Sequence, residues 1–475
     1  MPRDDWNMIA RKLVSVLSAR FINELGKETG FAVRLRDIQP ARLAIAAVDA
    51  LGTQQVSSLA DILRTFNSVA PVSVEYKPLH NQLRKQAFPV FARRLFEAVP
   101  GELVLDVLAP VPSSVLEAFD DIVLQDGGSF ALHKALAGHF PGRFTKVSPA
   151  AVELHARMSL FRMSLLTDQS IQVDLHPDKE SERARLPEPA SLANKLFMAD
   201  AGYEDLLYFN RVVEAGGTIP CRLKSNTTPK VHAAWLDGKA YRFQGGIRLK
   251  DLRCAHEGRN ADLDVQWVRK GKKARFRLIL VWNPERRSHM VLVTNIDRHL
   301  VSSVSTIRNL HRLGWRIELL FKEWKSFANL HWFATRIPAM AEGLIRLSLT
   351  AAAIKRFLVH AAERVHQDNE LSTQRAAKAL ANTREALLVD LPATRAVVET
   401  LRATLEYLNR NARRAHPKRD RRSGRPATGL RHARTHRNGP IERKPPANII
   451  YIRDMLELNQ RGSGRYQENR LKNAG

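Results

Sequence analysis

The sequence predicts an α/β fold with helical segments at both ends and a β-rich segment in the middle. Apolar residues recur at helical spacing in residues 1–110 and 303–410, whereas residues 111–302 contain short apolar runs and alternating apolar and polar residues. The chain has 475 residues, which is too long for one compact core. We therefore expect several domains, with boundaries near the points where the pattern changes.

The charge of the chain indicates a polyanionic partner. Its 75 Lys and Arg against 48 Asp and Glu give a formal net charge of +27, for which nucleic acid is the first candidate. No uncharged apolar run reaches the roughly 18 residues that span a membrane, and the opening MPRDDWNM does not resemble a signal peptide. We expect a soluble, cytoplasmic, nucleoid-associated protein whose Cys221 and Cys254 are reduced and hold no metal.

Residues 1–110 are predicted to form a helical DNA-binding domain. The helical stretch SLADILRTFNSV is followed by KPLHNQLRKQAFPVFARRLF, which is basic, and two such helices resemble a helix-turn-helix. The intervening loop is longer than the roughly 3–4 residues of that motif. A generic helical bundle therefore explains this segment equally well.

Residues 111–217 carry the α/β signature. DDIVLQDG places an apolar run before Asp126, and LFMA is followed by Asp200 and then by a helix that should close at Gly216 and Gly217. VELHARMSLF and SIQVDLHP are further strand candidates. Open sheets place their chemistry at the carboxyl ends of strands, although many aspartates there only cap helices.

Residues 218–302 should form a β-rich module, because several runs such as HMVLVTNI alternate or are continuously apolar. Its Trp267 and Trp282 are suited either to stacking on an unpaired base or to filling a small core. Residues 411–475 contain a dense run of Arg and Lys with Pro and Gly, which predicts a tail that is disordered when free and binds nucleic acid nonspecifically.

The stretch WRIELLFKEWKSFA at residues 315–328 predicts a helix with an apolar seam that includes Trp324. Glu318, Lys322 and Lys325 lie within about 60° of each other on another face, and His311 projects near that face. Taken alone, this pattern is also typical of an ordinary solvated helix surface.

These residues resemble the catalytic segments of bacterial insertion-sequence transposases of the DDE class, in the family numbered four. Its signature is Tyr, two residues, Arg, three residues, Glu, six residues, Lys, and six residues separate Glu318 from Lys325. LQDGGSFALH and LFMADAGY resemble the segments of the first and second acids, and the resemblance covers roughly residues 20–410. His311 and Gly314 stand where the signature has Tyr and Arg.

The resemblance implies a ribonuclease H-like catalytic core, in residues 111–217 and 303–410, interrupted by the β-rich insertion. It implies metal-dependent cleavage of DNA at terminal inverted repeats and strand transfer, by a homodimer on paired ends. Two Mg²⁺ ions, or Mn²⁺ in their place, would be held by the catalytic residues Asp126, Asp200 and Glu318. The DNA contacts would come from Lys325, Lys322, His311, Arg222, Lys224 and Asn226.

Two other functions remain compatible with the sequence. A transposase remnant could cover DNA ends without cutting them, because the charge and the tail suit binding alone. A nuclease with the same core could cut DNA without joining strands. The histidines His133, His139 and His155 show no metal-ligand spacing and are interpreted as surface or core residues.

Overall fold

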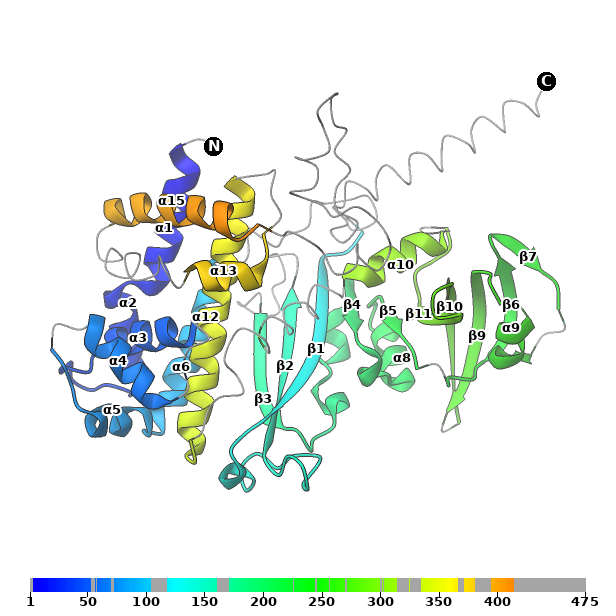
Figure 1. Ribbon diagram of the computed structural model, residues 1–475. Helices are drawn as coiled ribbons and strands as arrows, with labels where there is room; N and C mark the ends of the chain where they lie inside the picture. Colours follow the sequence, from blue (N-terminus) through cyan, green and yellow to red (C-terminus); the bar gives the residue numbers. More distant parts are fainter. Residues whose placement is uncertain are drawn as a thin grey trace.

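A helical body, a four-stranded sheet and a seven-stranded sheet lie side by side across the molecule (Figure 1). Among the helices of the described residues, none has the length and apolar character needed to cross a membrane. The computed structural model describes residues 3–52, 56, 58–69, 72–103, 118–159, 171–224, 226–243, 246–255, 257–269, 271–299, 301, 303–313, 324, 335–365, 371–380 and 394–413. Glu318, Lys322, Lys325 and Gly314 lie outside these described residues, as does the basic segment from residue 414 onward.

The helical body combines helices from the two ends of the chain around one core. The long helix α12 lies against α6 and α3 (Figure 1). A Cβ on Gly343 of α12 would come within 2.2 Å of the Phe88 ring of α6, so the glycine lets these two helices approach. The helices are α1 (Arg3–Leu17), α2 (Ala19–Glu28), α3 (Pro40–Gly52), α4 (Leu59–Val69), α5 (Tyr76–Leu83), α6 (Ala87–Leu103), α12 (Pro338–Val365), α13 (Thr373–Leu380) and α15 (Thr394–Asn411).

The four-stranded sheet has the order β3-β2-β1-β4, in which β1 and β4 are parallel and the other pairs are antiparallel. Its two faces contribute to different cores because side chains alternate along each strand. Ile122 and Leu124 belong to the core of the helical body, whereas Val123 belongs to the core shared with the second sheet. The strands are β1 (Asp121–Ala131), β2 (Ala151–Ser159), β3 (Ile171–Pro177) and β4 (Lys195–Ala199).

The predicted end of the first strand at Asp126 is wrong. Strand β1 continues through Gly127 and Gly128 to Ala131, because β2 pairs with it over that whole length. The two glycines look like a turn in the sequence, but pairing with β2 keeps them extended.

The segment after β4 begins with the short 3-10 helix η4 (Ala201–Tyr203) and continues into α8 (Leu206–Glu214). The Asp205 carboxylate caps α8 by accepting hydrogen bonds from the amides of Leu207 and Tyr208 at 3.0 and 3.1 Å. The helix ends before Gly216, which has a φ of +83° and closes it as the sequence predicts.

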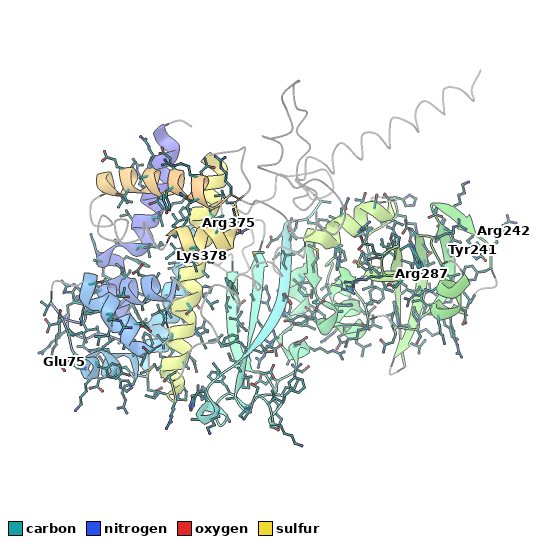
Figure 2. All side chains as sticks on the ribbon, in the orientation of Figure 1. Glu75, Tyr241, Arg242, Arg287, Arg375 and Lys378 are labelled. Atoms are coloured by element: carbon teal, nitrogen blue, oxygen red, sulfur yellow. The ribbon has the colours of Figure 1, made fainter. Side chains whose placement is uncertain are left out.

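The seven-stranded sheet is antiparallel, with the order β5-β11-β10-β9-β6-β7 and with β8 paired to β6. Figure 2 shows Tyr241 and Arg242 at its outer end, far from the helical body. The helix α9 (Leu249–Ala255) lies within residues 218–302, which the sequence predicts to be β-rich. The strands are β5 (Pro220–Arg222), β6 (Lys230–Leu236), β7 (Lys239–Tyr241), β8 (Ile247–Arg248), β9 (Ala261–Arg269), β10 (Lys272–Asn283) and β11 (Ser288–Thr294).

Trp267 and Trp282 of this sheet pack against neighbouring aromatic rings. Trp267 is buried and packs edge-on against Phe276, with ring centroids 5.9 Å apart, so it fills the core and is not available to stack on a base. Trp282 is half-buried and lies edge-on to His289 at 5.0 Å.

A buried ion network joins this sheet to the next helix, α10 (Val304–Leu313). Asp262 accepts hydrogen bonds from both Arg277 and Arg298, and Arg277 also donates to the carbonyl oxygens of Ile296 and Val301 at 3.0 and 2.8 Å. The network therefore fixes the segment that leads into α10.

Candidate active site

Asp126 and Asp200 occupy matching positions at the boundary between β1 and β4. In the parallel pairing of these strands, Gln125 lies opposite Ala199, so the two aspartates are the next residues on each side. Neighbouring strands lie about 4.8 Å apart. The fold thus brings together two carboxylates that are separated by more than seventy positions in the sequence.

Both aspartates lie on the sheet face that contributes to the core of the helical body. Asp126 is two residues beyond Leu124, and Asp200 is two residues beyond Met198 with extended backbone, so strand alternation places both side chains on the face of those core residues. Trp324, from the predicted glutamate helix, is buried in the same core. Its burial confirms the apolar position predicted for Trp324.

Each carboxylate accepts a hydrogen bond from the amide of the residue that follows it. The Oδ1 atom of Asp126 is 2.8 Å from the Gly127 amide nitrogen, and the Oδ1 atom of Asp200 is 2.6 Å from the Ala201 amide nitrogen. Asp126 is half-buried and Asp200 is exposed. Both side chains are therefore oriented by local backbone contacts.

His311 and Arg222 lie near Asp200. His311 is in the last turn of α10, which packs against β5, and Arg222 is the last residue of β5. The pKa of His311 is lowered to about 4, first by removal from solvent and then by the positive charge of Arg222, while the charge of Asp200 opposes the shift. The imidazole is consequently neutral at pH 7, so it can serve as a hydrogen-bonding group but not as a cation.

The remaining predicted DNA contacts in the described residues follow Arg222 in the chain. Lys224 and Asn226 are exposed, and the Lys224 amide donates to the Glu204 carboxylate at 2.7 Å. This hydrogen bond joins the loop after β5 to the segment just beyond Asp200. The other predicted site residues, Glu318, Lys322 and Lys325, lie outside the described residues.

Sequence reasoning missed a buried polar cluster behind the two aspartates. The Tyr203 hydroxyl is 2.7 Å from Nδ1 of His155, and Nε2 of His155 is 3.5 Å from the Glu153 carboxylate. Removal from solvent raises the pKa of Glu182, and the neighbouring Glu153 raises it further. The available signal was Tyr203 three residues after Asp200, since a tyrosine there can fold back under the sheet.

The aspartate pair suits a hard divalent cation, although it does not complete a metal site. Carboxylate oxygens are the donors that Mg²⁺ prefers. Among the described residues, no group of three or more His, Cys, Asp or Glu could hold a metal ion. Asp126 and Asp200 thus fit as two ligands of a site whose predicted third ligand, Glu318, is not described.

Part of the chain is similar to a known protein family. The model of the transposase DDE domain family matches residues 154–354. The matched range contains Asp200 and residues 315–328 and begins after Asp126.

Several proteins to which the chain is similar are transposases for insertion sequence elements. The chain is 21% identical over 252 residues to the transposase for insertion sequence element IS1151 of Clostridium perfringens, covering 45% of this chain and 51% of that protein. It is 21% identical over 364 residues to the transposase for insertion sequence element IS231E of Bacillus thuringiensis subsp. finitimus, covering 68% of this chain and 74% of that protein. It is 20% identical over 371 residues to the transposase for insertion sequence element IS231B of Bacillus thuringiensis subsp. berliner, covering 69% of this chain and 75% of that protein. The chain thus spans about half the length of the first of these relatives.

Both comparisons confirm the resemblance to DDE-class insertion-sequence transposases that the sequence motifs predict. Assignment to family four within that class stays a prediction.

Proposed function

We propose that this protein is a transposase that binds the terminal inverted repeats of an insertion sequence and catalyses metal-dependent DNA strand cleavage and strand transfer. The observation that carries the proposal is the placement of Asp126 and Asp200 at matching positions of neighbouring parallel strands. The match to the transposase DDE domain family supports it independently.

The fold supports a ribonuclease H-like core with a β-rich insertion. The four-stranded sheet is mixed and brings the first two acids to adjacent strands. The seven-stranded sheet lies between Asp200 and the predicted glutamate helix in the sequence, within the proposed insertion 218–302. The proposed boundaries of the other parts are 1–110, 111–217, 303–410 and 411–475.

The proposed catalytic residues are Asp126, Asp200 and Glu318, which would hold two Mg²⁺ ions. In such sites, bound metals activate the attacking oxygen and stabilise the leaving oxygen of a phosphodiester. Asp126 and Asp200 would supply hard oxygen ligands from a rigid sheet, and their amide hydrogen bonds would keep the carboxylates oriented.

Proposed DNA contacts surround the aspartates. Arg222 and Lys224 would bind phosphates, Asn226 would donate to them, and neutral His311 would hydrogen-bond near Asp200. Lys322 and Lys325 would add phosphate contacts from the glutamate helix. Exposed cations lie on the helical body, such as Lys378, and at the outer end of the seven-stranded sheet, such as Arg242 (Figure 2), and this distribution suits a long polyanion. Two DNA ends would be paired by a homodimer.

The test is cleavage of DNA that carries the element's own ends, in Mg²⁺ and then in Mn²⁺. Asp126→Ala, Asp200→Ala and Glu318→Ala should each abolish cleavage and leave DNA binding within about twofold of the unaltered protein, since none of these residues is proposed to bind DNA. Cleavage by Glu318→Ala at the unaltered rate would remove that residue from the proposal. A joining assay with a target plasmid separates a transposase from a nuclease that never joins strands.

A catalytically impaired remnant that only binds DNA is the second candidate. Gly314 replaces the signature arginine, and His311, which replaces the signature tyrosine, is neutral at pH 7. The site thus lacks one cation that relatives would direct at the DNA end. Cleavage only by a Gly314→Arg variant would favour this candidate, whereas cleavage by the unaltered chain would exclude it.

A further inference from the structure

Tyr203 links the segment that carries Asp200 to the far side of β1. It is the last residue of η4, and its side chain is 1% exposed. Its hydroxyl reaches His155 of β2, at 2.7 Å from Nδ1. Because β1 lies between β4 and β2, the side chain passes beneath β1 to make this contact.

The crossing point is Gly127, the residue directly after Asp126. A Cβ at this position would lie 2.9 Å from the Tyr203 hydroxyl and 3.3 Å from Nδ1 of His155. Real Cβ atoms essentially never approach another atom as closely as the first distance. The absence of a side chain at Gly127 therefore makes room for the hydrogen bond between Tyr203 and His155.

The protonation of the two side chains determines which of them donates the hydrogen bond. Burial raises the pKa of Tyr203, and the charge of Asp126 raises it further, so the phenol stays protonated and donates to Nδ1 of His155. The other ring nitrogen of His155 faces the buried Glu153 carboxylate at 3.5 Å, which favours a proton on Nε2 and leaves Nδ1 as the acceptor.

We propose that Tyr203 is a positioning residue for the two catalytic aspartates. Its hydrogen bond to His155 ties the turn that begins at Asp200 to the strand that pairs with β1 at Asp126. Strand pairing places Asp200 beside Asp126, but Asp200 is exposed and begins a single 3-10 turn, so this buried tether adds a second restraint on its position. The inference rests on the proposed function, because it assumes that the aspartates bind a divalent cation.

Such a tether matters because catalytic and metal-binding groups must be held within about 0.5 Å of their working geometry. Loss of the hydroxyl would leave the aromatic ring in the core and free the turn to shift. Metal binding should then weaken without a comparable loss of folding.

The chain offers a matched control for this change. Tyr208, in α8, is also buried, and its hydroxyl donates to the Pro187 carbonyl oxygen at 2.7 Å, in a contact that does not include either aspartate. Tyr203→Phe and Tyr208→Phe therefore each remove one buried tyrosine hydroxyl and one hydrogen bond of the same length, to a ring nitrogen and to a carbonyl oxygen respectively.

The experiment is calorimetric titration of the full-length protein with Mn²⁺, with thermal unfolding measured on the same samples. We expect Tyr203→Phe to weaken Mn²⁺ binding at least tenfold and Tyr208→Phe to leave it within twofold of the unaltered protein, with similar decreases in Tm. Equal Mn²⁺ binding by the two variants would overturn the inference.

A second pair of variants tests whether His155 acts as the acceptor of the Tyr203 hydrogen bond. The side-chain oxygen of Asn can replace Nδ1 of His155, whereas Leu offers no acceptor. His155→Asn should therefore retain Mn²⁺ binding better than His155→Leu, and equal weakening by both would contradict the tether.

Asp200→Asn separates failure of this inference from failure of the proposed function. If Mn²⁺ binding by the unaltered protein does not depend on Asp200, the proposed metal site is wrong and the inference falls with it. If binding depends on Asp200 but not on the Tyr203 hydroxyl, the metal site stands and only the tether is rejected.

Discussion

Gly127 leaves the space that the Tyr203 hydroxyl occupies, and this contact predicts a coupling between the two residues. Gly127→Ala should destabilise the protein, because the new methyl group would clash with the hydroxyl at 2.9 Å. In a Tyr203→Phe background the same substitution should cost less, with a coupling energy of about 0.5–3 kcal/mol between the two sites. Urea unfolding of the two single variants and the double variant measures this quantity.

The control for this cycle is Gly138→Ala, since a Cβ on Gly138 would meet no atom within 4 Å. Its effect on the free energy of unfolding should add to that of Tyr203→Phe without coupling. Strict additivity for Gly127 as well would mean that Tyr203 does not occupy the space beside it.

His289 gives a prediction about pH. Its ring is buried, which lowers its pKa, although the hydrogen bond to the Arg259 carbonyl oxygen opposes the shift. The unfolded chain therefore binds a proton more readily than the folded chain, and this contribution to stability is lost as the pH falls below about 6.5. In His289→Gln, the difference in free energy of unfolding between pH 7.5 and pH 5 should be smaller than in the unaltered protein.

His299→Gln is the matched control, because His299 is exposed. Unfolding by urea at the two pH values measures both variants. If His289→Gln and His299→Gln have the same pH dependence as the unaltered protein, burial of His289 does not contribute to acid sensitivity.

At the scale of elements, the Asp262 network anchors the segment that carries His311. The Asp262 side chain is 7% exposed and accepts from two guanidinium groups, so Asp262→Asn would leave Arg277 buried without its counter-charge. Breaking a buried pair in this way typically costs about 3–5 kcal/mol. We expect a loss of this order in the free energy of unfolding by denaturant.

Asp264→Asn tests whether burial is the reason for the large loss of stability expected from Asp262→Asn. Asp264 accepts from the same Arg298, but its side chain is 46% exposed, and exposed pairs contribute only about 0–1 kcal/mol. Similar losses for Asp262→Asn and Asp264→Asn would argue against a buried network.

The sequence predicts a helix or strand correctly where a local pattern of residues determines it. It does not predict features that depend on how strands pair with one another. The strand before Asp200 and the end of α8 at Gly216 follow from an apolar run and a glycine, and both are confirmed. The extension of β1 beyond Asp126 depends on pairing with β2, and the role of Tyr203 depends on the order of the strands. Neither relation is visible in a single sequence.

At the scale of the whole molecule, the two ends of the chain enclose one core. Helix α12 packs against α6 and α3, and the Lys355 ammonium donates to the Gly52 carbonyl oxygen at 3.0 Å. The four-stranded sheet packs on the same core through residues such as Leu124. The helical body therefore supports the sheet face from which both aspartates project. The two groups of helices that form this body lie more than 200 residues apart in the sequence.

The distribution of charge along the chain gives the last prediction. Residues 414–446 contain 11 Lys and Arg against Asp420 and Glu442, whereas residues 447–475 contain five basic and three acidic residues. Each phosphate that a cation neutralises adds roughly 0.9 to the slope of log affinity against log salt. Truncation after residue 413 should therefore reduce the salt slope of nonspecific DNA binding by several units, and truncation after residue 446 should leave it nearly unchanged. Fluorescence anisotropy with a duplex of unrelated sequence, between 50 and 300 mM salt, measures the three slopes. Equal slopes for all three proteins would place the nonspecific contacts in residues 1–413.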